Sequence, residues 1–168
     1  MNPKNAVINI SVRDLVERFV RAGDLTSGVF IPDRATAAIA LHQRIQRSRP
    51  QVYEPEVVIS HTCKSGSWSI HISGRIDGIF RYAEGMVLEE IKTTVQNPKD
   101  SGDADNPHHW AQLKLYAYML SMEHNLETVD TCLTYARLYS NATWEVRRTF
   151  SRNDLQVFFS ALILRLVQ

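Results

Sequence analysis

The spacing of apolar residues changes along the chain and divides it into helical and extended segments. Near the N-terminus and again after residue 33, apolar residues recur every three or four positions, which is typical of helices with one buried face. From residue 51 the period is two, which indicates strands. The predicted helices cover 12–22, 34–48, 107–123 and the segment after Ser151, and the predicted strands cover 52–63, 67–82, 86–93, 129–139 and 143–150.

Local signals mark the ends of several of these elements. Ser11 with Asp14, and Ser151 with Asp154, resemble capping boxes in which Asp replaces the usual Glu. Gly23 is expected to end the first helix, because glycine commonly follows the last helical turn.

Turn residues indicate how the strands pair. The sequences KSGS at 64–67 and AEG at 83–85 predict two hairpins, so the first three strands are expected to form an antiparallel meander. Segment 95–106 is polar and rich in Gly, Pro and Asp, which predicts a loop. The resulting order, ααβββαββα, predicts one mixed α/β domain over 1–168, with a central mixed sheet of about five strands flanked by helices.

A histidine lies on the apolar stripe of the second predicted helix. Asp33 can cap this helix. Its stripe is formed by Ala35, Ala38, Ile39, His42 and Ile45. A lone histidine in such a place is usually a core residue with satisfied ring nitrogens. The alternative is an imidazole that reaches a metal ion or a substrate beside the sheet.

Three charged residues lie within the otherwise apolar strand LEEIKTT at 88–94. Because strand side chains alternate, Glu90 and Lys92 share one face, whereas Glu89 lies on the other as a surface residue or a support for the site. A short turn joins this strand to the preceding one, so Asp77 is expected to lie across from Glu90. Two carboxylates and one ammonium group would then meet on a strand pair.

This cluster has a structural and a chemical interpretation. In the first, it is an exposed edge strand with surface salt bridges, each worth ~0–1 kcal/mol. In the second, it is a metal site, because close carboxylates repel each other unless a cation joins them. Mg²⁺ binds such oxygens and keeps several waters. On the third helix, Gln112 and Tyr116 share an inward face, where a buried amide needs polar partners.

Composition narrows the possible functions. Hydrophobic residues make up 44% of the chain, and the net charge of +1 gives no strong overall attraction to nucleic acid. The two cysteines, Cys63 and Cys132, cannot form a zinc or iron–sulfur site alone. With no signal peptide or membrane-length apolar run, a cytoplasmic location is expected and no membrane partner.

Four motifs in order resemble the PD-(D/E)XK nuclease superfamily, in its RecB-like branch. They are a helix with His42, GRIDG with Asp77, EIK with Glu90 and Lys92, and QLKLY with Gln112 and Tyr116. The resemblance covers most of the chain and implies a restriction-endonuclease-like core and a phosphodiester hydrolase that acts on DNA, either single-stranded DNA or duplex ends.

The same resemblance implies a role for each motif residue. The implied ligands of Mg²⁺ or Mn²⁺ are His42, Asp77, Glu90 and the backbone carbonyl of Ile91. Lys92 would position and activate the attacking water, and together with Asp77 and Glu90 would make up the catalytic set. Gln112 and Tyr116 would line the site and bind the substrate backbone.

Three segments also resemble the N-terminal nuclease domain of some bacterial DinG/XPD-like DNA helicases: residues 8–25, 89–94 and 106–120. This similarity implies a domain cut from a longer chain, with a C-terminal helicase partner and a role in DNA repair or processing. Several RecB-like relatives hold an iron–sulfur cluster with four cysteines. Because this chain has only two, no such cluster is expected within it. The alternative is a catalytically silent, nuclease-like DNA-binding module of a helicase.

Overall fold

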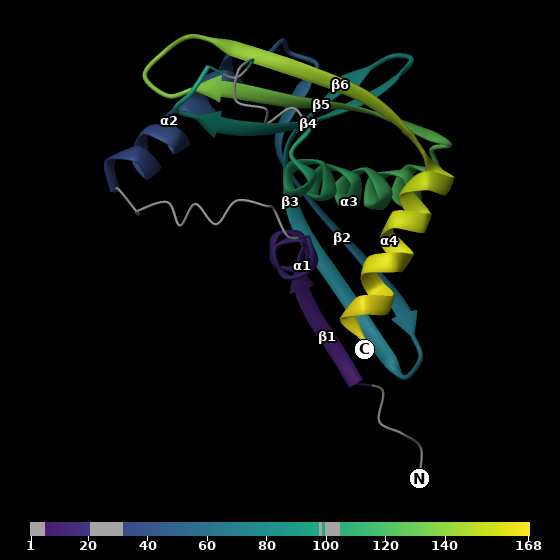
Figure 1. The fold of residues 1–168 in the computed structure, drawn as a ribbon. Helices are drawn as coiled ribbons and strands as arrows, with labels where there is room; N and C mark the ends of the chain where they lie inside the picture. The colour runs from purple at the N-terminus through teal and green to yellow at the C-terminus, as the bar shows by residue number, and fades with distance from the viewer. Residues whose placement is uncertain (1–5, 21–31, 98, 100–104) are drawn as a thin grey trace.

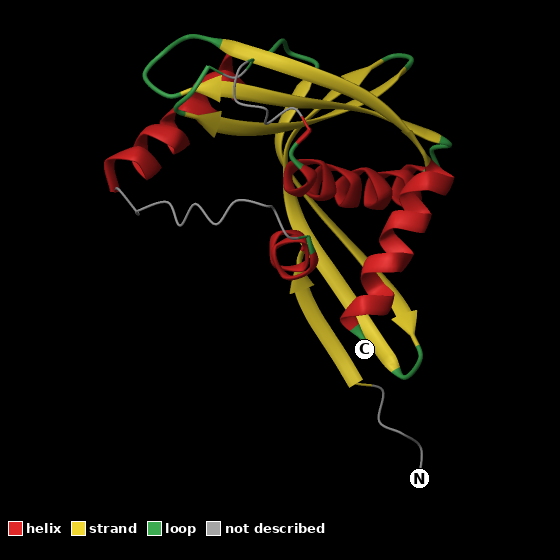
Figure 2. Ribbon diagram, in the orientation of Figure 1, coloured by secondary structure: helices red, strands yellow, loops and turns green. Residues whose placement is uncertain are grey.

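The computed structural model describes residues 6–20, 32–97, 99 and 105–168, and within them the chain alternates strands and helices as Figures 1 and 2 show. The elements are β1 (Ala6–Ser11), α1 (Val12–Phe19), α2 (Pro32–Ser48), β2 (Tyr53–Ser65), β3 (Trp68–Tyr82), β4 (Gly85–Thr94), α3 (Pro107–His124), β5 (Thr128–Arg137), β6 (Thr143–Ser151) and α4 (Arg152–Leu166). The predicted mixed α/β class is confirmed.

The strands form one mixed sheet. Its order is β1-β3-β4-β5-β6, and β2 pairs with β3 beside this path. The pairs β2–β3 and β3–β4 are antiparallel, which confirms both predicted hairpins, whereas β4 and β5 run parallel. A parallel pair needs a crossover, and the segment between these two strands contains α3.

The sheet forks in the middle of β3. Strand β2 pairs along almost all of β3, while the opposite edge of β3 pairs first with β1, up to Ser73, and then with β4, from Gly78. Residues 74–77 therefore lie between two strand partners on that edge. In Figure 1, β1 and the first half of β3 run away from β4, β5 and β6 at this point, and α3 lies between the two parts.

Helices cover the two faces of the sheet unequally. The large core packs α1, α3 and α4 against the sheet, with Leu15, Leu115 and Leu155 fully buried. A smaller core on the other face packs α2 against β4 and β5 through Leu41, Ile45 and other residues. The side chains of β4 alternate between these faces: Leu88 enters the large core and Ile91 the smaller one. Residues of β4 can therefore meet α3 on one side and α2 on the other.

Both predicted serine caps are confirmed. Ser11 Oγ accepts a hydrogen bond from the Asp14 N–H at 3.0 Å, and Ser151 Oγ accepts one from the Asp154 N–H at 3.1 Å. Each bond satisfies one of the N–H groups that the first turn of a helix leaves without a partner.

Some predicted boundaries are wrong. Strand β1 was not predicted, because six residues give a weak pattern and depend on the free edge of β3. Helix α1 ends at Phe19, where Val20 becomes extended, and Gly23 lies outside the described residues. Asp33 does not cap α2 but lies in its first turn.

Two further predictions concern the apolar stripe of α2 and the loop before α3. Ile39 is 61% exposed, so it is not part of the packed stripe of α2. The predicted loop is described only at 95–97, 99, 105 and 106, which lie outside the strands and α-helices. Within the described residues, no helix is both long and apolar enough to span a membrane.

Candidate active site

Two glycines give Asp77 its place at the fork of the sheet. A Cβ on Gly78 would lie 2.0 Å from the ring of Tyr53, and one on Gly74 would lie 2.6 Å from the ring of Tyr116. Both distances are far below van der Waals contact, so the two tyrosine rings can pack against β3 only because these positions carry no side chain. The glycines of GRIDG are thereby explained by packing on either side of Asp77.

The carboxylate of Asp77 completes the backbone hydrogen bonding of the fork. Its Oδ2 accepts a hydrogen bond from the N–H of Ile91 at 2.7 Å. The pairing of β3 with β4 ends at Gly78 and Glu89, so the Ile91 N–H lies just beyond the ladder and bonds to a side-chain acceptor in place of a strand. This contact fixes Asp77 beside the strand that carries the other charged residues.

Helix α2 brings two side chains to Asp77. His42 Nδ1 lies 3.9 Å from Asp77 Oδ1. One turn further along, Gln46 Nε2 donates to the backbone carbonyl of Asp77 at 2.9 Å and to Glu56 Oε1 at 2.8 Å. The helix is therefore tied to β3 at the predicted catalytic aspartate, and the histidine faces that aspartate from the same helix.

Strand β4 and helix α3 form the second part of the site. Lys92 Nζ donates to Glu90 Oε1 at 2.8 Å and to Gln112 Oε1 at 2.8 Å, and Gln112 Nε2 donates to Glu90 Oε1 at 2.7 Å. These three side chains form a closed triangle in which each contacts the other two. Glu90 is 3% exposed. The exposed-edge-strand interpretation is therefore wrong, because these charges face α3 rather than bulk solvent.

Burial disfavours the charged form of the Asp77 and Glu90 carboxylates. It raises the pKa of Asp77 to about 6, against the opposing effects of the Ile91 N–H and Lys92. It also raises the pKa of Glu90 to about 7, although Lys92 opposes the shift and Asp77 adds to it. The pKa of His42 is lowered, chiefly by burial, so its ring is neutral at physiological pH. A neutral imidazole and two carboxylates form a donor set suited to a divalent cation.

The family model of the PD-(D/E)XK nuclease superfamily matches residues 11–163 of the chain. The chain belongs to the PD-(D/E)XK nuclease superfamily. Membership suggests metal-dependent nuclease activity, and members of this superfamily typically use divalent metal ions.

One solved structure supports the same fold. The protein SSO0001 is similar to this PD-(D/E)XK domain, with a TM-score of 0.62 and 25% sequence identity over 98% of this chain and 78% of that chain. No curated protein matches the chain significantly.

One carboxylate oxygen among the predicted ligands has no hydrogen-bond partner in the described part of the chain. Both bonds to Glu90 go to Oε1, whereas its Oε2 is buried without a hydrogen-bond partner. A buried carboxylate oxygen without a partner is costly, and a bound cation removes that cost. The residues present therefore fit a divalent ion between Asp77 and Glu90.

A different acidic group lies on the opposite face of β4. Among the described residues, the only histidine, cysteine and acidic side chains that place three donor atoms within 4.8 Å of one another are Glu89, Cys132 and Glu145. It follows that His42, Asp77 and Glu90 are not all this close, so an ion held by all three requires a side-chain rotation or an intervening water.

Arginine already neutralises the group formed by Glu89, Cys132 and Glu145. Arg49 pairs with Glu89 and lies 3.2 Å from Glu145, and burial raises the pKa of Cys132 to about 11, which keeps the thiol neutral. A neutral thiol is a poor metal ligand. These contacts favour an ion-pair network over a second metal site.

Glu89 was predicted to be either a surface residue or a support for the site, and the surface alternative is wrong. Its side chain is fully buried, where Thr134 Oγ1 donates to it at 2.5 Å in addition to the bonds from Arg49. The alternation of side chains correctly put Glu89 on the face opposite Glu90. Its burial depends on Arg49, which follows α2 and lies forty residues earlier, so no local pattern could reveal it.

The structure places the two predicted substrate-binding residues differently from each other. Gln112 contacts Glu90 and Lys92 directly, as described above. Tyr116 is 4% exposed, and burial, with a contribution from Glu90, raises its pKa to about 12. Its ring lies against Gly74, so it supports the fork of the sheet from the α3 side.

An open cleft of about 780 Å³ leads to Asp77 and His42, and its walls contain residues that sequence reasoning missed. Glu56 has a left-handed backbone with φ of 57°, which is uncommon for a residue other than glycine. Its carboxylate pairs with Arg75 at 2.7 Å and accepts the bond from Gln46. The sequence pattern pointed to Asp77, the neighbour of Glu56 in β3, but not to Glu56 itself.

Proposed function

We propose that this domain is a Mg²⁺- or Mn²⁺-dependent deoxyribonuclease of the RecB-like branch that hydrolyses phosphodiester bonds in DNA. The observation that carries the proposal is the buried triangle of Glu90, Lys92 and Gln112 beside Asp77 and His42, with one carboxylate oxygen left for a cation. Arg13 and Arg75 line the cleft that leads there and can contact phosphates.

The proposed ligands are Asp77, Glu90, His42 and the backbone carbonyl of Ile91. A divalent cation held there would supply positive charge for the pentavalent phosphoryl group and favour ionisation of the attacking water. The protein prepares this position by burying two carboxylates, which raises the pKa of both, and a bound cation would favour their charged forms.

Lys92 is proposed to position the water and stabilise charge on the phosphoryl oxygens. An ammonium group has three N–H donors, and two of them are directed to Glu90 and Gln112. The third can reach water or a phosphate oxygen, because the side chain of Lys92 is 20% exposed. Gln112 bonds to both charged partners, so it fixes the rotamer of Lys92 before substrate arrives.

A labelled-oligonucleotide assay tests this proposal. Single-stranded DNA and duplexes are incubated with Mg²⁺, with Mn²⁺ or with a chelator, and products are resolved on denaturing gels. Cleavage is expected only with added metal. Lys92→Ala and Asp77→Ala are expected to reduce the rate by about 100-fold or more, as removal of a charge-stabilising group in an active site commonly does. If both variants cut as fast as the parent, the assigned site is wrong.

A second candidate function is a catalytically silent DNA-binding module. The net charge near zero is compatible with weak binding that depends on local patches. Against it, a module that only binds DNA has no use for two buried carboxylates that repel each other. Titration calorimetry with Mn²⁺ separates the two functions, because the silent module predicts no metal binding at Asp77 and Glu90.

We further propose that residues 1–168 form a single domain of a longer cytoplasmic protein that contains a DNA helicase and acts in DNA repair or processing. Support comes from the resemblance of segments 8–25, 89–94 and 106–120 to helicase-associated nuclease domains. Sequencing the surrounding reading frame tests this directly, since a downstream segment without helicase motifs contradicts it.

A further inference from the structure

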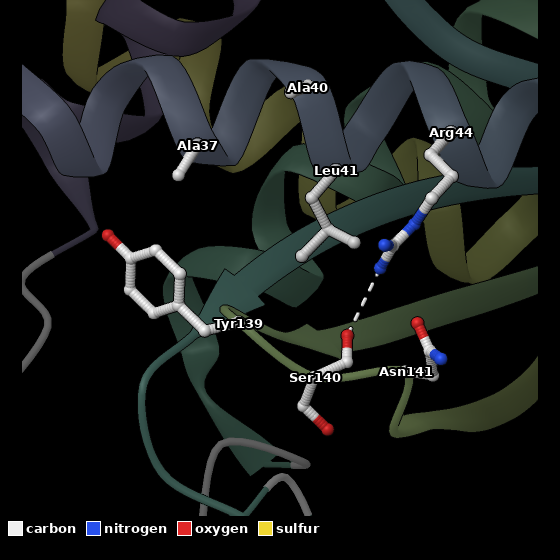
Figure 3. Close-up of a pocket in the computed structure, with 7 residues that line it drawn as sticks. All are labelled: Ala37, Ala40, Leu41, Arg44, Tyr139, Ser140 and Asn141. Atoms are coloured by element: carbon white, nitrogen blue, oxygen red, sulfur yellow. Dashed lines mark hydrogen bonds between the residues drawn. The ribbon is translucent and has the colours of Figure 1, made fainter.

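A second hollow lies on the other side of α2 from the metal-binding residues. It has a volume of about 440 Å³ and is formed between α2 and the connection from β5 to β6 (Figure 3). Ala37, Ala40 and Leu41 form its apolar wall. Because alanine side chains are small, the helix surface recedes here and leaves a slot that a planar group can enter.

One end of the slot is formed by an exposed aromatic ring. Tyr139 is 77% exposed and has a left-handed backbone with φ of 60°, which is uncommon for a bulky residue. Figure 3 shows its ring projecting from the β5–β6 connection toward the Ala37 end of α2. At this exposure the ring packs little against the described residues, although the backbone conformation that presents it is unfavourable. Such a conformation is a reason to look for a function.

The other end of the slot is formed by a fixed cation. Arg44 Nη2 donates to the backbone carbonyl of Ser140 at 3.1 Å, which anchors the guanidinium across the gap (Figure 3). Among the described residues, none of those that line the slot is acidic. An aromatic face, a guanidinium plane and small apolar side chains are the surfaces on which unstacked nucleobases bind in proteins that hold single strands.

The slot lies at the same end of the sheet as the proposed catalytic lysine. Strands β4 and β5 run parallel, with Lys92 opposite Tyr135. Tyr139 follows Tyr135 by four residues, so it lies no more than roughly 14 Å further along the strand direction. Helix α2 separates the slot from the cleft, with Leu41 lining the slot and the adjacent residue, His42, lining the cleft.

From this placement we propose that the slot between Tyr139 and α2 binds one unstacked base of the single-stranded DNA whose phosphodiester is cleaved at Asp77 and Glu90. This inference rests on the proposed nuclease function and adds a position at which the strand is held, a few nucleotides from the bond that is cut. Stacking on a ring does not depend on base identity, so the slot would hold the strand without selecting a sequence.

Binding of a fluorescein-labelled, single-stranded oligonucleotide in metal-free, low-salt buffer tests the slot without cleavage. Tyr139→Ala is expected to weaken binding about 5-fold or more, the usual effect of removing a base-stacking side chain, and Tyr139→Phe to stay within about twofold of the parent. Tyr139→Gly removes the ring but suits the left-handed backbone, so it is expected to weaken binding while the protein melts at or above the parent temperature.

A matched control is available on the same sheet. Tyr82 is also an exposed tyrosine, but it lies in the hairpin between β3 and β4, at the opposite end of β4 from Lys92. Tyr82→Ala is expected to leave binding unchanged. Equal binding by Tyr139→Ala, Tyr139→Gly and the parent, or no measurable binding by the parent itself, would overturn the proposed slot.

A single abasic nucleotide moved along the oligonucleotide locates the bound base. One position is expected to weaken binding to the parent and to have no further effect on Tyr139→Ala, whereas equal loss with both proteins at every position contradicts the slot. Cleavage with Mn²⁺ is measured separately. Parent protein that binds with this pattern but does not cut would refute the nuclease and retain the slot, whereas cutting unaffected by Tyr139→Ala, with unchanged binding, would do the reverse.

Discussion

Replacing Asp77 by Asn is predicted to stabilise the metal-free protein. Burial raises the pKa of this carboxyl from 3.8 to about 6. The folded protein therefore holds the proton more tightly than the unfolded chain, and stability falls as pH rises from about 4 to about 6. At pH 7.5 this penalty is fully present. Asn mimics the neutral form, and its amide oxygen can still accept the bond from the Ile91 N–H.

The magnitude follows from the size of the shift. About two pKa units correspond to on the order of 2–3 kcal/mol, and partial solvent access reduces the expected gain to about 1–2 kcal/mol. For a domain of this length that is a rise of roughly 2–8 °C in melting temperature. Calorimetric melting in EDTA at pH 7.5 and again at pH 4.5 measures it, and the gain should shrink at the lower pH because the parent is then protonated.

Saturating Mn²⁺ provides the complementary measurement. The parent is expected to gain stability by binding the ion, whereas Asp77→Asn is expected to gain little, so the order of melting temperatures reverses. Asp130→Asn, at a position on β5 outside the site, should change stability by less than about 0.5 kcal/mol and serves as the control. If Asp77→Asn melts below the parent in EDTA at pH 7.5, the argument from burial of the Asp77 carboxylate is refuted.

Three other substitutions test the surroundings of the site. Gly78→Ala places a methyl group 2.0 Å from a buried tyrosine ring and should cost at least about 2 kcal/mol in urea unfolding, whereas Gly85→Ala, with open space around it, should not. Arg49→Met leaves Glu89 buried without its cation and should cost about 3–5 kcal/mol, so a smaller loss would show that the pair is dispensable. Gln46→Ala removes the hydrogen bond from α2 to β3 and should weaken Mn²⁺ binding in titration calorimetry. Gln46→Glu cannot donate that bond and should weaken Mn²⁺ binding equally. Unchanged affinity would show that this link does not position the ligands.

The parts of the fold that follow from local patterns could be predicted. Two-residue alternation separated Glu90 and Lys92 from Glu89, and the turn residues gave the β2–β3–β4 meander. Serine caps located the starts of two helices. These features depend on residues a few positions apart, so their cause is visible in the sequence.

The parts that depend on distant partners could not be predicted. Strand β1 exists because β3 offers a free edge, and the burial of Glu89 depends on Arg49. Gln46 and Glu56 contact Asp77 or its neighbours only after α2 and β2 have packed together. Likewise, Tyr139 is an ordinary residue in a connection until its backbone angle and the facing alanines of α2 are known.

A crystal soaked with Mn²⁺ shows directly whether Asp77, Glu90 and the carbonyl of Ile91 hold a divalent cation. Anomalous scattering at the manganese absorption edge locates the ion without reference to activity. We expect a peak bounded by these three groups, with His42 close to it. A peak between Glu89, Cys132 and Glu145 in place of this one, or no peak beside Asp77 at saturating Mn²⁺, would contradict it.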